Sequence, residues 1–259
     1  MELSQIGEPI VLTEQRGFVL WVTLSRPRAA NALSSELVQA LHRVLLEAEQ
    51  NPDLKVLIFR GAGQNFCGGA DLRELLSGGA AHVRTMMNEL RDFLLHLERS
   101  PLVTIAAVHG AARAGGLELC LACDVVISSE SASFGDAHLA NALLPAGGAT
   151  VRLPRIVGWA RAKWLILSAE PIAASIAQSW GLVLSVVADQ ELATEAKRIA
   201  ALFEKKERAA LEGAKFLLAS TFEQPMSALL ENEIAALVSH STTEVFQNGV
   251  RNFLAKRAS

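Results

Sequence analysis

Two glycine-rich turns, about forty-five residues apart, constrain this chain more than any other feature. The first turn, residues 65–72, follows the apolar run 56–59, and the second turn, residues 112–119, follows the apolar run 102–108. Each segment has the pattern of a strand that passes through a turn into a helix, and a helix start offers unpaired backbone N–H groups. Two such donors at one point form a site for a carbonyl oxygen that becomes negative during a reaction.

Strands alternate with helices through the first three quarters of the chain. Apolar, β-branched runs predict strands, and apolar residues at helical spacing predict helices. The predicted strands are 18–24, 56–60, 102–108 and 125–128, and the predicted helices are 34–50, 81–98 and a short one after Gly115. Strands this apolar are typical of a sheet covered on both faces, so we predict an α/β fold.

The pattern changes after about residue 189. Residues 191–205, 208–220 and 226–240 all have helical patterning, and no strand is predicted beyond them. We therefore predict two parts, an α/β core over residues 1–190 and a helical C-terminal region over residues 191–259.

Composition and charge exclude several classes of protein. The chain has 259 residues, of which 51% are hydrophobic and 20% charged. This composition is typical of globular proteins rather than of disordered ones. A net charge of -3 gives no basic footprint for nucleic acid and no polybasic membrane segment. The N-terminus lacks a signal-peptide pattern, and the apolar region 164–188 is interrupted by Glu170, Pro171 and Gly181. We therefore expect a cytoplasmic protein with neither nucleic-acid nor membrane partners.

Two alternative sites fit the sequence poorly. Residues 61–66 lack the third glycine of a dinucleotide fingerprint, and no G-K-[ST] occurs, so a nucleotide fold is disfavoured. Cys120 and Cys123 form a C-x-x-C pair, but their neighbours are apolar, which predicts buried structural cysteines rather than a redox or zinc site. We expect no metal.

The order of short motifs resembles the crotonase superfamily, the enoyl-CoA hydratase/isomerase family. The resemblance covers almost the whole chain and rests on the motifs Arg26-Pro27, residues 66–72, residues 115–119 with 123–124, Phe134-Gly135, residues 145–148, residues 152–154, residues 170–172 and 181–183, and residues 253–256. Each motif is weak alone, and their order and spacing together are specific. The resemblance implies a spiral core of repeated ββα units, with C-terminal helices that build a homotrimer or a dimer of trimers.

The resemblance also implies a substrate and the residues that hold it. The substrate would be an acyl-CoA or an acyl-carrier-protein thioester, and the backbone N–H groups of Ala70 and Gly115 would form the oxyanion hole. Coenzyme A would be bound by Arg73, Phe253 and Lys256, the last two in a neighbouring subunit's site. Since the substrate itself carries coenzyme A, no separate cofactor is expected.

The acid/base residues depart from the family pattern. Hydration in this family uses two glutamates; Glu118 occupies the first position, whereas His138 occupies the second. Histidine exchanges protons near neutral pH, so a pair of Glu118 and His138 can still position a water. Asp71 is expected to support a helix start, Asp136 either orients His138 or is a turn residue, and Arg113 is expected to face solvent.

Three functions remain open on these residues. The leading hypothesis is an acyl-CoA lyase of the enoyl-CoA hydratase type, which adds water to a 2-enoyl thioester or removes it from a 3-hydroxyacyl thioester. The second is an isomerase or decarboxylase that uses the same oxyanion hole, a hypothesis suggested by His138. The third, of another class, is a catalytically inactive thioester-binding protein, because a fold does not fix a function. A mechanism that needs a tyrosine is excluded, since the chain has none.

Overall fold

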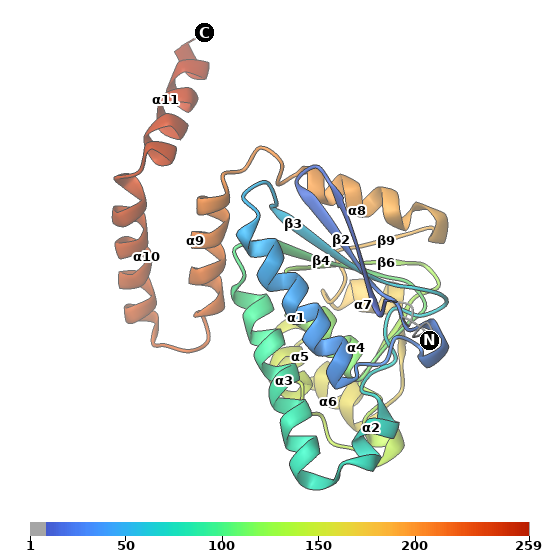
Figure 1. The fold of residues 1–259 in the computed structure, drawn as a ribbon. Coiled ribbons are helices and arrows are strands. Elements are labelled where there is room, and N and C mark those ends of the chain that lie inside the picture. The colour runs from blue at the N-terminus through green and yellow to red at the C-terminus, as the bar shows by residue number, and fades with distance from the viewer. Residues whose placement is uncertain (1–8, 259) are drawn as a thin grey trace, which may run out of the picture.

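A six-stranded sheet forms the centre of the protein (Figure 1). The computed structural model describes the backbone of residues 9–258 and the side chains of residues 9–255. The sheet order is β1-β2-β3-β4-β6-β9; β1 pairs antiparallel with β2, and the other neighbours are parallel. Its strands are β1 (Val11–Arg16), β2 (Val19–Leu24), β3 (Val56–Gly61), β4 (Val103–Val108), β6 (Val125–Ser129) and β9 (Ser185–Val187).

A smaller sheet and eleven α-helices complete the described part of the chain. The second sheet, β5-β7-β8, consists of β5 (Ala111–Arg113), β7 (Ser133–Gly135) and β8 (Ile172–Ala173). The helices are α1 (Ser35–Gln50), α2 (Leu72–Ser77), α3 (Gly79–Arg99), α4 (Gly115–Ala122), α5 (Ala149–Val157), α6 (Trp159–Ser168), α7 (Ala174–Ser179), α8 (Leu192–Ala201), α9 (Arg208–Ala219), α10 (Met226–Ser241) and α11 (Glu244–Ala258), with short 3-10 turns η1 (Pro27–Ala29), η2 (Leu139–Asn141) and η3 (Asp189–Glu191). The α/β class and the helical C-terminal region are confirmed.

The middle of the main sheet is buried on both faces, because most residues of β2, β3 and β4 are apolar and buried. In β4 all six residues are buried. Val103, Ile105 and Ala107 belong to the core on one side of the sheet, which includes residues of α8, whereas Ala106 and Val108 belong to the larger core shared with α1, α3 and α4. This alternation follows from the period of two in a strand, and it explains the continuous apolar run in the sequence.

The C-terminal helices divide into two groups. Helix α8 covers one face of the main sheet, whereas α9, α10 and α11 lie beside and beyond the core (Figure 1). None of the described helices is both long and apolar enough to cross a membrane. The boundary between the two parts at residue 190 remains a prediction. The first eight residues of the predicted core, residues 1–8, lie outside the described residues.

An ion pair between the buried Lys215 and the more exposed Asp124 fastens α9 to the core. Nζ of Lys215 donates hydrogen bonds of 2.7 Å to Oδ2 of Asp124 and of 2.7 Å to the carbonyl of Leu102. The same carboxylate oxygen accepts a hydrogen bond from the backbone N–H of Thr104. The ammonium is therefore paired on the core side of the helix, where an unpaired charge would be costly.

Replacing Lys215 should weaken this attachment. We expect Lys215→Met to lower the free energy of unfolding by about 2 kcal/mol, because a charged hydrogen-bonding partner of Asp124 is lost. Urea unfolding at one fixed protein concentration measures the effect. The control, Lys197→Met on the exposed face of α8, should change the value by less than about 0.5 kcal/mol. Equal values for the two variants would contradict the assignment.

Candidate functional site

The two glycine-rich turns lie against each other in the structure. The N–H of Cys67 donates to the carbonyl of Ala111 over 3.0 Å, and the N–H of Arg113 donates to the carbonyl of Cys67 over 3.0 Å. A Cβ atom at Gly116 would collide with the Cys67 carbonyl oxygen. The second turn can therefore approach the first this closely only because residue 116 has no side chain.

The amides of Ala70 and Gly115 lie close together as a result. A Cβ atom built at Gly115 would stand 3.5 Å from the nitrogen of Ala70, and one built at Gly69 would stand 3.5 Å from the nitrogen of Gly115. Of the backbone hydrogen bonds that the described residues make outside helices and strands, none is donated by either amide. Both residues line one cavity. Two backbone amides without such a partner therefore lie close together at the wall of one cavity.

Backbone strain accompanies this arrangement. Ala114, which precedes α4, has φ 47° and ψ −117°, a conformation that a residue with a Cβ rarely adopts. Its N–H donates to the carbonyl of Gly135 in β7 over 3.0 Å. Such strain persists where the surroundings fix the backbone, and it is common at functional sites.

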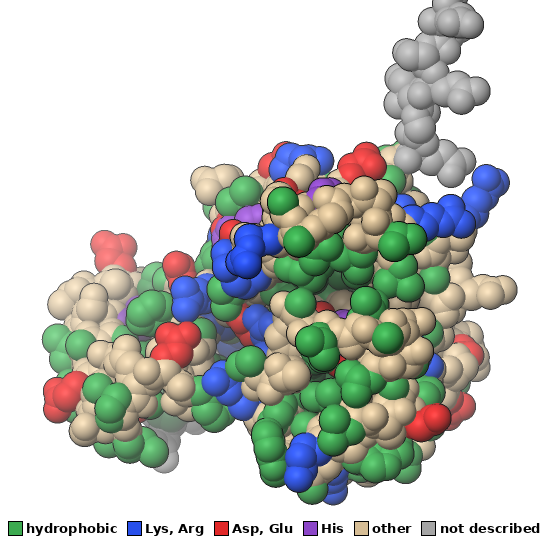
Figure 2. All heavy atoms as spheres, turned by 90° about the horizontal axis from the view of Figure 1, so that it is seen from below, with side chains coloured by type: hydrophobic (Ala, Val, Ile, Leu, Met, Phe, Trp, Pro, Cys, Tyr) green, Lys and Arg blue, Asp and Glu red, His purple; other side chains and the backbone are tan. Residues whose placement is uncertain are grey.

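The cavity has a volume of about 680 Å³ and a mainly apolar lining. On the face of the molecule that Figure 2 shows, hydrophobic side chains surround a central hollow. The apolar side chains that line the cavity come from α2, α3 and the segment around η2: Leu72, Leu75, Leu76, Val83, Met87, Leu90, Leu143 and Leu144. A lining of this kind suits an aliphatic chain better than a charged one.

Glu118 lies in the cavity wall, on the first turn of α4. Its side chain is buried, and Oε1 accepts hydrogen bonds from the N–H of Gly147 over 2.8 Å and from the N–H of Ala149 over 3.0 Å. Burial raises the pKa of the Glu118 carboxyl, although those hydrogen bonds and the charge of His138 oppose the rise. Among the described residues, no hydrogen bond to Oε2 is formed.

His138 lines the same cavity and has Asp136 beside it. Nδ1 of His138 is 3.0 Å from Oδ1 of Asp136, although the ring N–H is not aligned for a hydrogen bond. Asp136 is fully buried, and its Oδ2 has no partner among the described residues. Burial by itself lowers the pKa of His138, but the contact with Asp136 and the negative charges of Asp136 and Glu118 outweigh it, so the pKa is raised. Asp136 therefore favours the charged imidazolium.

Asp71 supports the start of α2, as the sequence predicts. Its Oδ1 accepts from the N–H groups of Arg73 and Glu74, and its Oδ2 accepts from the guanidinium of Arg26 over 2.9 Å. Arg26 and the first turn are joined further by Asn31, whose amide donates to three carbonyls in the segment 62–66. The motif Arg26-Pro27 thus belongs to the scaffold of the first turn.

The structure does not bring all the predicted site residues together. Arg73 is exposed on α2 and does not line the cavity. Phe253 lies on α11, which extends away from the core (Figure 1). Lys256 belongs to the same helix, but its side chain lies outside the described residues. The roles of all three in binding coenzyme A remain predictions.

The expectation that Arg113 faces solvent is wrong. The side chain is half-buried, and it donates to the carbonyl of Ser133 over 2.6 Å and to Oγ of Ser133 over 2.8 Å. Burial lowers the pKa of its guanidinium. The residue therefore joins the second turn to β7, a pairing that the sequence did not predict because β7 itself was not predicted.

The three cysteines are free. Cys67 and Cys120 are buried, which confirms the structural interpretation for Cys120, whereas Cys123 is half-buried. Burial raises the pKa of Cys67 to about 12 and raises that of Cys120 well above its ordinary value. No group of three or more potential metal ligands occurs within the described part of the chain.

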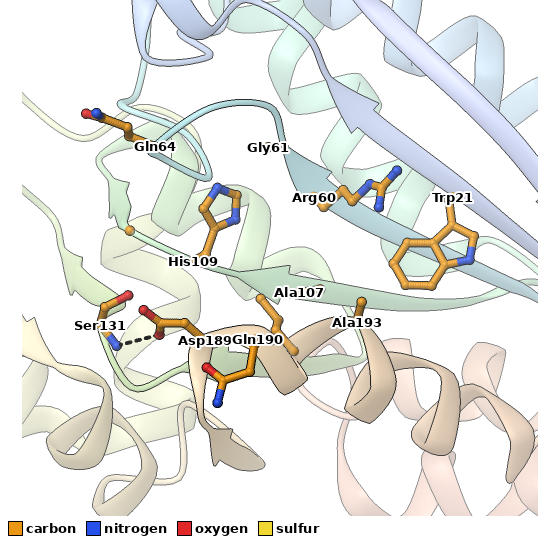
Figure 3. Close-up of a pocket in the computed structure, with 12 residues that line it drawn as sticks. Trp21, Arg60, Gly61, Gln64, Ala107, His109, Ser131, Asp189, Gln190 and Ala193 are labelled. Atoms are coloured by element: carbon orange, nitrogen blue, oxygen red, sulfur yellow. Dashed lines mark hydrogen bonds between the residues drawn. The ribbon is translucent and has the colours of Figure 1, made fainter.

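A second hollow, of about 460 Å³, lies at the carboxyl ends of β3 and β4 beside the start of α8 (Figure 3). Three of its polar or charged side chains contact other parts of the protein. Asp189 accepts from the N–H of Ser131 over 3.2 Å, and His109 lies 3.0 Å from the carbonyl of Gly63. The guanidinium of Arg60 lies 5.0 Å from the centre of the Trp21 ring. None of the predicted site residues lines this hollow.

Comparisons with known proteins match almost the whole chain. A family model described as enoyl-CoA hydratase/isomerase matches residues 14–259. The 2,3-dehydroadipyl-CoA hydratase of Escherichia coli is 35% identical over 97% of both chains. The crystal structure of an enoyl-CoA hydratase from Bacillus anthracis superposes with a TM-score of 0.91 at 33% identity, over 96% of this chain and 97% of that one. The structure of DspI from Pseudomonas aeruginosa superposes with a TM-score of 0.91 at 30% identity, over 98% of both chains.

The contact between the turns can be tested with a matched pair of substitutions. We expect Gly116→Ala to lower the free energy of unfolding by about 1–3 kcal/mol, because the added methyl group forces the two turns apart. Gly213→Ala makes the same change inside α9, where a Cβ would meet nothing within 4 Å. It should raise the value by about 0.5–1 kcal/mol through helix propensity. Urea unfolding of both variants measures the difference, and equal shifts would contradict the close contact.

Proposed function

Because the chain belongs to the enoyl-CoA hydratase/isomerase family, we propose that it is an acyl-CoA lyase that adds water to a 2-enoyl thioester or removes it from a 3-hydroxyacyl thioester. One observation carries the proposal. Two backbone amides, a buried carboxylate and a histidine all border one cavity with an apolar wall. A thioester has the matching parts: a carbonyl oxygen, reacting α and β carbons, and an aliphatic tail.

The amides of Ala70 and Gly115 would act on the thioester carbonyl. Hydrogen bonds to this oxygen withdraw electrons from the conjugated double bond and make the β carbon electrophilic. They also stabilise the enolate that forms once water has attacked. Because the donors are fixed by the contact between the turns, no reorganisation is needed, and the loss of one such donor typically costs about 3 kcal/mol of transition-state stabilisation.

Glu118 and His138 would move the protons. A water molecule between them loses a proton to one of the pair as its oxygen bonds to the β carbon. The other group delivers a proton to the α carbon, so that the elements of water are added across the double bond. A carboxyl with a raised pKa beside an imidazole with a raised pKa can share the single proton that this scheme needs.

The rest of the substrate would extend from both sides of this centre. The apolar side chains of α2 and α3 suit an aliphatic acyl chain. Arg73 is proposed to bind the phosphates of coenzyme A, and Phe253 and Lys256 the nucleotide end of a ligand in a neighbouring subunit. The proposal therefore includes a homotrimer or a dimer of trimers. The exposed apolar residues of α10, among them Leu230, Ile234 and Leu237, favour such an assembly.

One observation favours a second candidate. The position expected to carry a second carboxylate holds His138, and its partner Asp136 favours the charged ring. A single base and one oxyanion site suffice to move a double bond or to stabilise the enolate left by decarboxylation. Mass spectrometry of the products separates the reactions: a gain of water, no change in mass, or a loss of carbon dioxide.

The direct assay of the proposed function uses crotonyl-CoA and longer 2-enoyl-CoAs. We expect formation of 3-hydroxyacyl-CoA, and Glu118→Gln should lower kcat by about 100- to 10,000-fold, because a positioned acid/base group is lost. Glu47→Gln, on the exposed face of α1, is the matched control and should leave kcat within twofold. A folded wild-type protein that turns over no thioester, or a Glu118→Gln variant with full activity, would refute the proposal.

The Asp136–His138 pair predicts a pH effect of definite sign. The negative charge of Asp136 helps to raise the pKa of His138, so Asp136→Asn should lower that pKa. The imidazolium then loses its proton at lower pH, and the high-pH limb of the kcat profile should move toward acid. The exposed Asp92→Asn on α3 serves as the control and should leave the profile unchanged. A folded Asp136→Asn variant with an unmoved high-pH limb would contradict this role.

A further inference from the structure

Behind Glu118, on the side away from the cavity, an arginine holds the glycine turn that bonds the carboxylate. Arg152, in α5, donates from Nε and Nη2 to the two carboxylate oxygens of Glu98 over 2.6 and 2.8 Å. Its Nη1 donates to the carbonyl of Gly147 over 2.6 Å. One guanidinium therefore joins the end of α3 to the turn that precedes α5.

The other side of the same turn contacts Glu118. The N–H of Gly147 and the N–H of Ala149 are the two donors to Oε1 of Glu118. Space is tight on both sides: a Cβ at Gly147 would collide with the Glu118 carboxylate, and a Cβ at Gly148 would collide with the Arg152 guanidinium. Gly148 also has φ 107°, a value that favours glycine. The turn is thus packed between the two charged side chains.

We propose that Arg152 and Glu98 form a clamp that fixes the Gly147 turn and thereby the orientation of the Glu118 carboxylate, with Oε2 presented to the cavity. The inference rests on the proposed function, in which Glu118 moves a proton. Arg152 is a positioning residue in this account, because it reaches the reacting atoms only through the turn. Glu98 holds the guanidinium in the one orientation that directs Nη1 at the carbonyl of Gly147.

The shape of the guanidinium explains why arginine stands at this position. Its planar fork binds a carboxylate with two parallel hydrogen bonds and leaves a further N–H for the carbonyl. A lysine at position 152 has a single ammonium group, which cannot reproduce the paired contact and the third bond in the same geometry. Without the clamp, the two adjacent glycines have wide conformational freedom, and the two donors to Glu118 lose their fixed directions.

The clamp acts by position and not by charge. The carboxylate of Glu98 neutralises the guanidinium, and the groups that shift the pKa of Glu118 are its burial, the N–H groups of Ala149 and Gly147, His138 and Asp136. A change at Arg152 therefore reaches Glu118 through the two backbone hydrogen bonds. Because these bonds lower the pKa of Glu118 against the effect of burial, weakening them should raise it.

The test compares Arg152→Lys with a matched ion pair that does not contact the turn. Arg99, the residue after Glu98 in α3, forms an ion pair with Glu223 over 3.2 Å. Arg99→Lys therefore makes the same arginine-to-lysine change in an ion pair that does not contact the turn. We expect Arg152→Lys to lower kcat for enoyl-CoA hydration about 10- to 100-fold, the scale of a small misplacement of a catalytic group, with KM within threefold. Arg99→Lys should change neither constant. Glu98→Gln keeps the shape of the Glu98 side chain but removes its charge, and it should lower kcat by less than Arg152→Lys does. This variant tests the clamp if Arg152→Lys does not fold.

A second readout does not depend on turnover. Titration of the Glu118 side-chain carboxyl by carbon-13 NMR, with its signal identified by its absence in Glu118→Gln, should show a higher pKa in Arg152→Lys than in the wild type. A purely structural role for Arg152 lowers stability without moving this value. Folded Arg152→Lys and Glu98→Gln variants with an unchanged pKa of Glu118 would overturn the clamp. A wild-type protein inactive on every thioester, but with the shift present, would refute the proposed function and leave the clamp standing.

Discussion

The contact between the two glycine-rich turns is the constraint on which the rest of the site depends. Strands β3 and β4 run parallel in the main sheet, so their carboxyl ends bring both turns to the same edge. Hydrogen bonds between Cys67 and the segment 111–113 then hold the turns together. The missing side chain at Gly116 permits the approach. The position of two amides thus follows from sheet topology and from one glycine.

The ionisable groups of the cavity depend on that scaffold in a different way. Glu118 is carried by α4, which begins at the second turn, and His138 follows β7, which pairs with β5 of the same turn. Both groups are buried in a mainly apolar cavity, where a charge is costly unless it is paired. Glu118 is bonded by two backbone amides, and His138 has Asp136 at 3.0 Å. Burial raises the pKa of Glu118 against the effect of its hydrogen bonds. Burial lowers the pKa of His138, but the contact with Asp136 and the negative charges of Asp136 and Glu118 outweigh it and raise the pKa.

The sequence predicts those strands and helices whose buried residues form a continuous apolar run or a helical spacing of apolar residues. Strands β3 and β4 are continuous apolar runs, and α1 and α3 show helical spacing, so each was expected within a few residues of its observed bounds. Strand β1 was missed because five of its six residues are exposed and mostly polar. Strands β7 and β8 were missed because segments of two or three residues carry no period. Arg113 was expected to face solvent because β7, which holds its partner Ser133, was not predicted.

The same distinction holds for the site. The turn residues Ala70 and Gly115 and the two side chains Glu118 and His138 were expected from motifs, and the structure brings all four to one cavity. The sequence predicts no role for Arg152 beyond its place in a motif, because a hydrogen bond from a side chain to a backbone carbonyl five residues away leaves no pattern in composition or periodicity. The contacts proposed between α11 and the coenzyme A of a neighbouring subunit's ligand remain predictions.

The central claim, that two amides hold one thioester oxygen, is tested most directly by infrared difference spectroscopy of bound butyryl-CoA. This saturated ligand cannot add water, and a carbon-13 label at its carbonyl isolates the C=O stretch. We predict that the stretch moves to lower frequency on binding, because two hydrogen bonds weaken the double bond, and that Glu118→Gln leaves the shift in place. A bound ligand whose carbonyl stretch remains at its frequency in water would contradict the account.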